Sequence, residues 1–375
     1  MIKVGITGQE GFVGKHLYNT LGLFPDEFSR VEFQRNFFEN DKELEAFVSQ
    51  CDVIVHLAAM NRHESQDVIY ETNVNLVEKL VASLERTNSK PHVLLSSSSQ
   101  EERDNLYGKS KKEGRQLVAN WAVKNQAVFT GLIIPNVFGP FGKPFYNSVV
   151  ATFCHQVSHN EMPKIDVDGD LKLIYVSELV QEIINQIRNK NHQPKLEIQA
   201  TSEKKVSEIL ALLQHYKSEY QDKGSIPTLA STFELNLFNT FRCYMDIATH
   251  FPVKLMQHTD DRGSFVEIIR LEVGGQVSFS TTKPNITRGN HFHTRKIERF
   301  AVIKGKALIQ LREIGTDEVL NFELNGDEPA YVDMPIWYTH NIKNIGEDIL
   351  YTNFWINEFF DPNDADTYFE EVEKA

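Results

Sequence analysis

The sequence has little cysteine, no long apolar run and no recognisable targeting segment. Its three cysteines, Cys51, Cys154 and Cys243, are isolated and odd in number, which argues against a disulfide framework and predicts reduced thiols. No segment approaches the roughly 18 consecutive apolar residues of a transmembrane helix. Residues 1–4 run directly into an apolar strand pattern, without the charged and apolar regions of a secretory signal. We therefore expect a cytoplasmic protein that has no membrane partner.

Basic residues are also scarce, because 39 Lys and Arg face 52 Asp and Glu, for a formal net charge of −13. No region gathers enough positive charge to follow a phosphate backbone, so we expect no nucleic-acid partner. The acidic excess is typical of an ordinary solvated surface. The 375 residues, of which 41% are hydrophobic, are enough for two domains that each bury a core.

The pattern of strands and helices divides the chain near residue 250. Up to residue 140, apolar strands alternate with helices, and the expected strands are 3–7, 31–33, 52–57, 93–96 and 128–134. Such strands predict a parallel sheet with helices on both faces. Residues 140–250 are mixed and mostly helical, whereas short β-rich runs separated by turn residues follow Phe251 and Pro252, as in a barrel or sandwich. The expected fold is α/β, with a Rossmann-type doubly wound parallel sheet in residues 1–250, followed by an all-β barrel in residues 251–375.

A glycine-rich turn follows the first expected strand, with the sequence Thr7-Gly8-Gln9-Glu10-Gly11-Phe12-Val13-Gly14. Gly8 permits a sharp exit from the strand, Gly11 permits close approach of a pyrophosphate, and Gly14 permits close packing of the helix on the sheet. The helix that begins around Phe12 and Val13 offers N–H groups and the positive end of its dipole to an anion. The turn therefore predicts a binding site for a dinucleotide cofactor.

The end of the second expected strand indicates which dinucleotide binds. An acidic residue there would bond the ribose 2′-hydroxyl of NAD, but Phe33 is followed by Gln34 and Arg35. A guanidinium suits the 2′-phosphate of NADP. Arg35 therefore favours NADPH as the cofactor, while Glu32 nearby keeps NAD as the alternative.

Tyr107 and Lys111 form a candidate redox site together with a serine. They are four residues apart on an expected helix and so project from one face. A cation one turn away should stabilise the phenolate and draw the pKa of Tyr107 from about 10 towards neutrality. The serine should come from the run Ser96–Ser99 at the end of the fourth strand, where it would polarise a substrate carbonyl.

Residues 1 to about 250 resemble an extended short-chain dehydrogenase/reductase, a group that handles nucleotide-sugars. The resemblance rests on the TGxxGxxG form of the glycine turn, on the Tyr-x3-Lys pair and on His56–Ala59 after the third strand. It implies that Ser98 is the catalytic serine beside Tyr107 and Lys111, and that the protein pairs as a homodimer. It also implies cofactor contacts from Leu57, Ala58, Asn73 and Lys111, and substrate contacts from Asn136 and Asn147.

A candidate metal site lies in the β-rich half. His291 and His293 alternate on an expected strand and so point to one face. Glu298 and His340 complete a set of four ligands of the kind that Zn, Fe, Mn or Ni accept. The pattern HxHx4Ex6G, followed by His340, resembles the metal cupins. We therefore expect a cupin barrel that holds one divalent metal ion, with zinc as the first candidate.

A second resemblance overlaps the first. Segments 260–267 and 288–291 look like those of the rhamnose-pathway keto-sugar epimerases, which are also cupins and use the histidine of such an RGxH segment as a base. The resemblance implies substrate contacts from Arg262 and Glu267. It leaves two alternatives, because a metal-bound His291 has no free lone pair: another residue removes the proton, or the metal is structural. The other candidates for the base or acid are His258, Asp261, Lys283 and Tyr338.

The two halves fit one substrate. A 4-keto nucleotide-sugar has acidic C–H bonds beside its carbonyl, so a cupin can epimerise C3 or C5 through an enolate before a reductase removes that carbonyl. The whole chain, including the ending 357–369, resembles the CapF-type enzymes of capsule and O-antigen synthesis. That resemblance implies UDP-2-acetamido-2,6-dideoxy-4-hexulose as substrate, epimerised at C3 and then reduced at C4 with NADPH, on the route to UDP-N-acetyl-L-fucosamine.

Two alternatives come from other classes of protein. One is a non-enzymatic sugar-nucleotide sensor, against which the intact set of Tyr107, Lys111 and Ser98 argues. The other is an epimerase or dehydratase without net redox change. A dehydratase would carry an acidic residue beside the serine, where this chain has Ser97 and Ser99.

Overall fold

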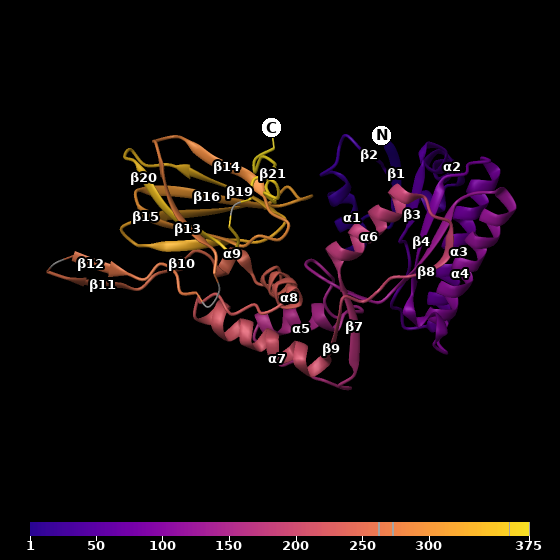
Figure 1. Cartoon of the computed structure of the whole chain (residues 1–375), viewed down its shortest axis with the longest axis horizontal. Coiled ribbons are helices and arrows are strands. Elements are labelled where there is room, and N and C mark those ends of the chain that lie inside the picture. Colours follow the sequence, from indigo (N-terminus) through magenta and orange to yellow (C-terminus); the bar gives the residue numbers. More distant parts are fainter. Residues whose placement is uncertain (262, 272–273, 360, 375) are drawn as a thin grey trace. The chain divides into compact units, whose positions relative to one another are not determined.

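The computed structural model describes residues 1–261, 263–271, 274–359 and 361–374, so Arg262 lies outside the described residues. The chain forms two compact units (Figure 1). Unit 1 contains residues 1–152 and 167–206, and unit 2 contains residues 153–166 and 207–375. The domain boundary near residue 250 stays a prediction, and most of the helical segment before that residue belongs to the compact unit that contains the barrel.

A six-stranded parallel sheet forms the centre of unit 1, which confirms the predicted Rossmann-type architecture. In spatial order its strands are β2 (Phe28–Val31), β1 (Ile2–Thr7), β3 (Val53–His56), β4 (His92–Ser98), β5 (Phe129–Ile134) and β8 (Gln193–Glu197). A second, three-stranded sheet contains β6 (Asn136–Phe138), β7 (Asp170–Tyr175) and β9 (Ser202–Lys205).

Helices cover both faces of the large sheet. The covering helices are α1 (Phe12–Leu21) and α6 (Val176–Asn189) on one face, and α2 (Asp41–Gln50), α3 (Gln66–Arg86) and α4 (Leu106–Asn125) on the other (Figure 1). Successive side chains of a strand point to opposite faces. Accordingly Val53 and Val55 belong to the core with α1 and α6, whereas Ile54 belongs to the core with α2, α3 and α4. Strands β3 and β5 are buried along their whole length and largely apolar, because both of their faces are covered.

The second strand begins three residues earlier than predicted, and it ends two residues earlier. It spans Phe28–Val31 and pairs with β1 from Ile2 to Gly5. Phe33, which made 31–33 look like a strand, is buried because its ring packs against those of Phe38 and Phe47. Its apolar character thus reflects packing under α2 rather than membership of the sheet.

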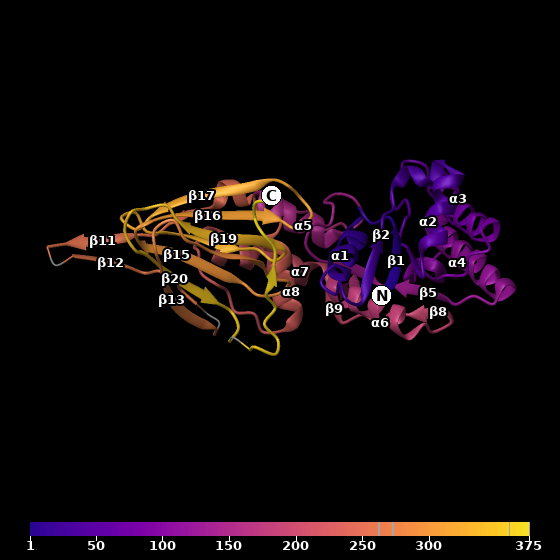
Figure 2. The ribbon, with the colours of Figure 1, turned by 90° about the horizontal axis from the view of Figure 1, so that it is seen from above.

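Two five-stranded antiparallel sheets form the barrel of unit 2 (Figure 2). One sheet contains, in order, β10 (Val253–Lys254), β18 (Ala330–Met334), β15 (Glu298–Lys304), β20 (Leu350–Ile356) and β13 (Gln276–Thr282). The other contains β17 (Val319–Asn325), β16 (Lys306–Glu313), β19 (Tyr338–Asn344), β14 (Thr287–Phe292) and β21 (Tyr368–Phe369). A separate hairpin is formed by β11 (Gln257–Asp260) and β12 (Gly263–Val266). An apolar core that includes Val302, Ile309 and Leu311 confirms the predicted all-β, cupin-like barrel.

Buried polar contacts connect the helical segment of unit 2 to the barrel. The helices concerned are α5 (Val149–Ser158), α7 (Val206–Tyr216), α8 (Thr232–Arg242) and α9 (Ile247–His250), of which α5 and α7 begin in unit 1. Arg299 donates two hydrogen bonds to the fully buried carboxylate of Asp333, at 2.7 and 3.0 Å. The hydroxyl of Tyr220, in the helical turn Lys217–Asp222 after α7, donates a third at 2.6 Å and accepts from Arg242 of α8 at 3.1 Å. Breaking such a buried charge network would leave an unpaired charge, so the network holds this segment to the barrel.

No helix in the described part of the chain is both long enough and apolar enough to cross a membrane.

Candidate functional site

The glycine turn has the geometry that a bound pyrophosphate requires. Gly8 has φ of +78°, and a Cβ on Gly14 would lie 2.1 Å from the Gly8 carbonyl oxygen. Only glycine at position 14 therefore allows this contact between helix and turn. Helix α1 begins at Phe12, and its first turn has neither a side-chain cap nor an acidic residue. Its first N–H groups can accordingly receive an anion.

The end of β3 lies beside the glycine turn. The backbone N–H of Leu57 donates to the Thr7 carbonyl at 3.0 Å, and that of Ala58 lies 3.5 Å from the Thr7 hydroxyl. Asn73 holds the following loop, because its amide bonds both the N–H and the carbonyl of Met60, at 2.7 and 3.0 Å. Asn73 thus fixes the loop after β3, and its direct contact with a cofactor stays a prediction.

The residues that should select the cofactor follow β2. Arg35 is exposed at the start of a 3₁₀ turn that spans Arg35–Glu39. The Glu32 carboxylate accepts a hydrogen bond from Gln34 at 2.8 Å. The guanidinium is therefore accessible to a ligand, while the carboxylate that would favour NAD already has a partner.

Tyr107 and Ser98 are brought together by the start of α4. The helix is capped by Asn105, whose side chain accepts from the N–H of Gly108 at 2.7 Å. A Cβ on Gly108 would lie 2.1 Å from the Gln100 carbonyl oxygen, so glycine is needed for the helix to approach the turn after β4. In this arrangement the Ser98 side chain hydrogen-bonds the phenol of Tyr107.

Burial dominates the electrostatics of this site. It raises the pKa of Tyr107 to about 12, and the nearby Tyr146 adds to the rise. Burial also lowers the pKa of Lys111 to about 8. The Lys111 ammonium donates to the Ser96 carbonyl at 2.9 Å. The prediction that Lys111 lowers the pKa of Tyr107 is therefore wrong for this structure, and the raised pKa keeps the phenol protonated, as a proton donor requires.

The serines of the run differ in their contacts. The Ser96 hydroxyl donates to the His56 carbonyl at 3.2 Å. The Ser97 hydroxyl donates to Glu101, whose carboxylate also accepts two bonds from Arg115 at 2.7 and 2.8 Å. Ser98 is the serine that bonds Tyr107, and the catalytic role that the resemblance implies for it stays a prediction.

No sequence pattern singled out Tyr146. Its hydroxyl accepts from the N–H of Asn61 at 3.2 Å, and its proximity raises the pKa of Tyr107. Its neighbour Asn147 is exposed, and Asn136 donates its amide to the Lys172 carbonyl at 3.1 Å. The substrate contacts of these two asparagines stay predictions.

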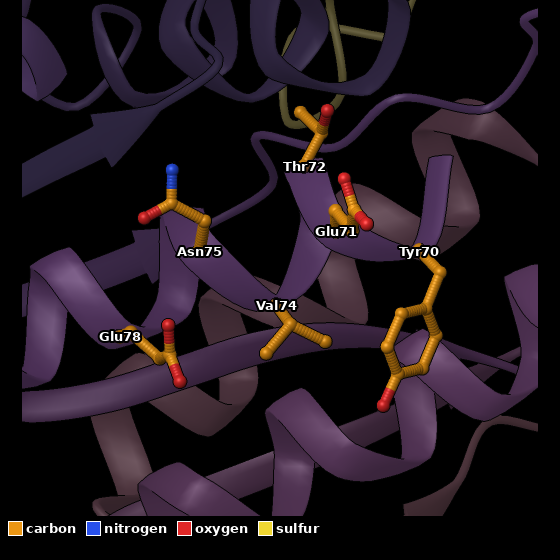
Figure 3. Close-up of a pocket in the computed structure, with 6 residues that line it drawn as sticks. All are labelled: Tyr70, Glu71, Thr72, Val74, Asn75 and Glu78. Carbon is orange, nitrogen blue, oxygen red and sulfur yellow. The ribbon is translucent and has the colours of Figure 1, made fainter. Parts of the chain in front are cut away.

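A hollow along α3 does not suit an anionic ligand. Figure 3 shows its lining, which is Tyr70, Glu71, Thr72, Val74, Asn75 and Glu78. These residues include two carboxylates and no cationic side chain, and none of them was predicted as a site residue.

The four predicted metal ligands converge in unit 2. Donor atoms of His291, His293, Glu298 and His340 all lie within 4.8 Å of one another. His291 lies in β14, Glu298 begins β15 and His340 lies in β19. The prediction that both His291 and His293 lie on a strand is corrected in one respect: a bulge interrupts β14 before His291, and the strand ends at Phe292. His293 instead opens the turn to β15.

The charges in this cluster fit a cation. Nε2 of His293 and Nε2 of His340 lie 3.0 and 3.1 Å from Oε2 of Glu298. Burial opposes ionisation of Glu298, but its bonds to these two histidines hold its pKa well below the usual value. Burial and the other two histidines lower the pKa of His291 to about 4, which leaves its lone pair free. A metal ion lies about 2.0–2.2 Å from its nitrogen and oxygen ligands, so donor atoms within 4.8 Å of one another can share one ion.

Backbone carbonyls orient two of the histidines. Nδ1 of His340 donates to the Tyr338 carbonyl at 3.1 Å, and Nδ1 of His293 donates to the Asp366 carbonyl. With Nδ1 donating to a carbonyl, each ring turns Nε2 toward Glu298, and loss of the Nε2 proton would free a lone pair for a metal ion.

Of the remaining predicted residues of unit 2, Tyr338 contacts a ligand through its backbone carbonyl, which accepts from Nδ1 of His340. Glu267 forms an exposed ion pair with Arg270 at 2.7 Å. His258, Asp261 and Lys283 are exposed. Burial and Glu313 raise the pKa of the Tyr338 phenol. The substrate contact of Glu267 and the choice of base stay predictions.

Two known families match this chain. The family described as NAD dependent epimerase/dehydratase matches residues 4–198, and the one described as polysaccharide biosynthesis C-terminal domain matches residues 258–368. The UDP-2-acetamido-2,6-beta-L-arabino-hexul-4-ose reductase of Pseudomonas aeruginosa is 30% identical, covering 98% of each chain. The spore coat polysaccharide biosynthesis protein SpsL of Bacillus subtilis is 28% identical, over 30% of this chain and 82% of its own.

Solved structures agree over the full length. The crystal structure of the capsular polysaccharide assembling protein CapF of Staphylococcus aureus has 37% identity and a TM-score of 0.62, covering 99% of this chain and 100% of CapF. A structure of CapF with the inhibitor 3-isopropenyl-tropolone has 35% identity, a TM-score of 0.58 and the same coverage. The chain therefore belongs to the NAD dependent epimerase/dehydratase family, and it carries a polysaccharide biosynthesis C-terminal domain after the nucleotide-binding sheet.

Proposed function

We propose that this chain is a bifunctional nucleotide-sugar enzyme of capsule and O-antigen precursor synthesis. The cupin barrel of unit 2 epimerises C3 of a UDP-2-acetamido-2,6-dideoxy-4-keto-hexose. Unit 1, here termed the reductase unit, then reduces the C4 ketone with NADPH, towards UDP-N-acetyl-L-fucosamine. One observation carries the proposal. The set of Ser98, Tyr107 and Lys111 occurs in the same chain as the His/Glu cluster, and that chain aligns over 98% of its length with a 4-keto-sugar reductase.

In the reductase unit the residues supply protons and orientation, and NADPH, when bound, supplies the hydride. The buried phenol of Tyr107 keeps its proton at neutral pH and donates it to the C4 oxygen as that oxygen becomes negative. Ser98 donates a hydrogen bond to the same oxygen. The Lys111 ammonium bonds the nicotinamide ribose. The exposed Arg35 pairs with the 2′-phosphate, which favours NADPH over NADH.

In the cupin the C4 carbonyl makes the neighbouring C–H bond acidic, so epimerisation at C3 must precede reduction. His291, His293, Glu298 and His340 would hold a divalent ion, for which we propose zinc, and that ion would supply positive charge beside the enolate oxygen. The tropolone that inhibits CapF carries adjacent carbonyl and hydroxyl oxygens, a typical chelating pair, which supports a metal here. Because a metal-bound His291 cannot act as base, another group moves the proton, and the candidates are His258, Asp261, Lys283 and Tyr338.

A dehydratase without net redox change fits the described contacts less well. The acidic residue near the serines, Glu101, is bonded by Arg115 and Ser97 and so has a structural partner.

The three free cysteines support a reducing, cytoplasmic setting, and the homodimer is proposed on family resemblance.

The test is to follow NADPH absorbance during incubation with the 4-keto-sugar. Stoichiometric consumption of NADPH with formation of a reduced sugar is the expected result. Isomerised sugar without consumption would identify an epimerase, and binding without any turnover would identify a sensor.

A further inference from the structure

The C-terminal segment 364–372, here termed the strap, lies along the strands that carry the predicted metal ligands. Its strand β21 pairs with β14 opposite His291 and Phe292. The Glu370 N–H donates to the Asn290 carbonyl at 3.0 Å, and the Thr339 hydroxyl donates to the Glu370 carbonyl. The strap thus bonds residues directly before His291 and His340.

Asp366 makes the closest contact between the strap and a ligand. Its carbonyl oxygen accepts the Nδ1 proton of His293, 73 residues earlier in the chain. This bond fixes the tautomer, so that Nε2 faces Glu298. His340 obtains the same support from Tyr338 on its own strand, whereas His293 depends on a distant segment.

The Asp366 side chain holds the turn between two ligands. One carboxylate oxygen accepts from the N–H of Thr294 at 3.1 Å, and the other accepts from the N–H groups of Arg295 and Lys296, each at 3.0 Å. These three residues belong to the four-residue connection, 294–297, between His293 and Glu298. Asp366 is 5% exposed and has φ of +43°. The turn is therefore held by a buried carboxylate, and the residue that carries it adopts an unfavourable backbone conformation.

We propose that Asp366 is a positioning residue of the metal site, which sets the orientation of His293 and its separation from Glu298. The proposal rests on the metal site proposed above. It assigns a role to the ending of the sequence that neither the reductase residues nor the four ligands explain. Outer bonds of this kind typically change metal affinity by about 10–100-fold.

The test compares full-length Asp366→Ala and Asp366→Asn with Asp364→Ala. Asp364 is a matched control, because it lies on the same strap and carries the same charge but bonds the exposed side chain of Arg295. Zinc affinity is measured by competition with a chelating dye. The visible spectrum of each protein saturated with Co²⁺ reports the ligand geometry, which a merely structural role would not alter.

We expect Asp366→Ala to bind zinc about 10–100-fold more weakly and to show a changed Co²⁺ spectrum. Asp366→Asn, which tolerates the same backbone conformation, should show a smaller change, and Asp364→Ala should match wild type. Unchanged affinity and spectrum in both Asp366 variants would overturn the proposal, as would an unchanged spectrum accompanied only by lower stability of the metal-free protein. If wild type itself binds no zinc, or His293→Ala binds it equally well, the metal site itself is wrong.

Discussion

The two candidate sites of this chain have opposite electrostatic character. In the reductase unit, burial keeps a proton on Tyr107 and disfavours the charge on Lys111, whose pKa falls to about 8. In the cupin, three histidines surround a carboxylate whose pKa is held low. The first site therefore suits a neutral proton donor, whereas the second suits a cation. Two chemistries that need opposite fields are better served by separate pockets than by one.

The two sites also differ in how their residues are supported. Tyr107 and Lys111 lie on one helix, and Ser98 is positioned by a turn only two residues away at Gln100. The metal ligands depend on bonds across long stretches of sequence, such as that between His293 and Asp366. The comparison predicts that variants in each unit will impair one activity and spare the other.

The largest effect is expected from Tyr107→Phe. The variant lacks the proton donor to the C4 oxygen, so NADPH oxidation with the keto-sugar should fall by about 10²–10⁴-fold. Tyr70→Phe is the control, because it removes a hydroxyl from the surface of the same unit. A Tyr107→Phe enzyme that retains more than a tenth of the wild-type rate would contradict the assignment.

The next largest effect is expected from His293→Ala. Elemental analysis of wild type purified without added metal should find about one divalent ion per chain, since a buried donor set is costly to leave empty. Losing a ligand should weaken metal binding by more than the roughly 100-fold that loss of an outer partner can cost. His215→Ala, an exposed histidine of the same unit, should bind metal normally. NADPH binding should survive in both variants, and its loss in His293→Ala would argue against independent sites.

A smaller effect is expected from Arg35→Ala. The variant should bind NADPH about 10–150-fold more weakly, which corresponds to the roughly 1.5–3 kcal/mol of a hydrogen bond to a charged group. NADH affinity should change little. Arg30→Ala is the control, because Arg30 lies on β2 but bonds the Tyr18 carbonyl. Equal losses for the two cofactors in Arg35→Ala would remove the basis for NADPH preference.

The smallest effect concerns pH and Lys111→Met. Because burial lowers the folded-state pKa of Lys111 from 10.5 to about 8, the charged form is penalised below pH 8. Between about pH 8 and 10.5 the unfolded state binds a proton that the folded state does not, so stability contributed by this group rises with pH. Lys111→Met should therefore be more stable than wild type at pH 7 by ~1–3 kcal/mol, with a smaller gain at pH 10.

Urea unfolding of the reductase unit at the two pH values measures this difference. Lys109→Met, which removes an exposed ion pair with Asp104, should show no such trend. A gain for Lys111→Met that is equal at both pH values would mean that burial of the ammonium is not its source.

The sequence predicts most of the architecture and the chemical groups of both sites, because these follow from short-range patterns. The apolar strands of unit 1, the i, i+4 pair of Tyr107 and Lys111, and the three ligands from His291 to Glu298 each lie within a short segment. The position of β2 was missed because the buried Phe33 imitates a strand residue.

The supports of the sites are not predictable from such patterns. The place of His293 beyond the end of β14, the contact of Tyr146 with Tyr107 and the bonds of Asp366 all depend on segments that meet only in the folded chain. The lowered pKa expected for Tyr107 failed for the same reason, since burial raises this pKa and the nearby Tyr146 adds to the rise. Motifs thus indicate which groups act, whereas tertiary contacts set the pKa values of those groups.

The most direct test of two separate sites is proton exchange in heavy water with the 4-keto-sugar and NADPH. Exchange at C3 needs only the carbonyl and the cupin, whereas NADPH oxidation needs Tyr107. Tyr107→Phe should therefore incorporate deuterium at C3 at close to the wild-type rate while NADPH remains, and His293→Ala should lose that exchange. The account is falsified if Tyr107→Phe stops deuterium incorporation as completely as it stops NADPH oxidation, because both steps would then belong to one active site.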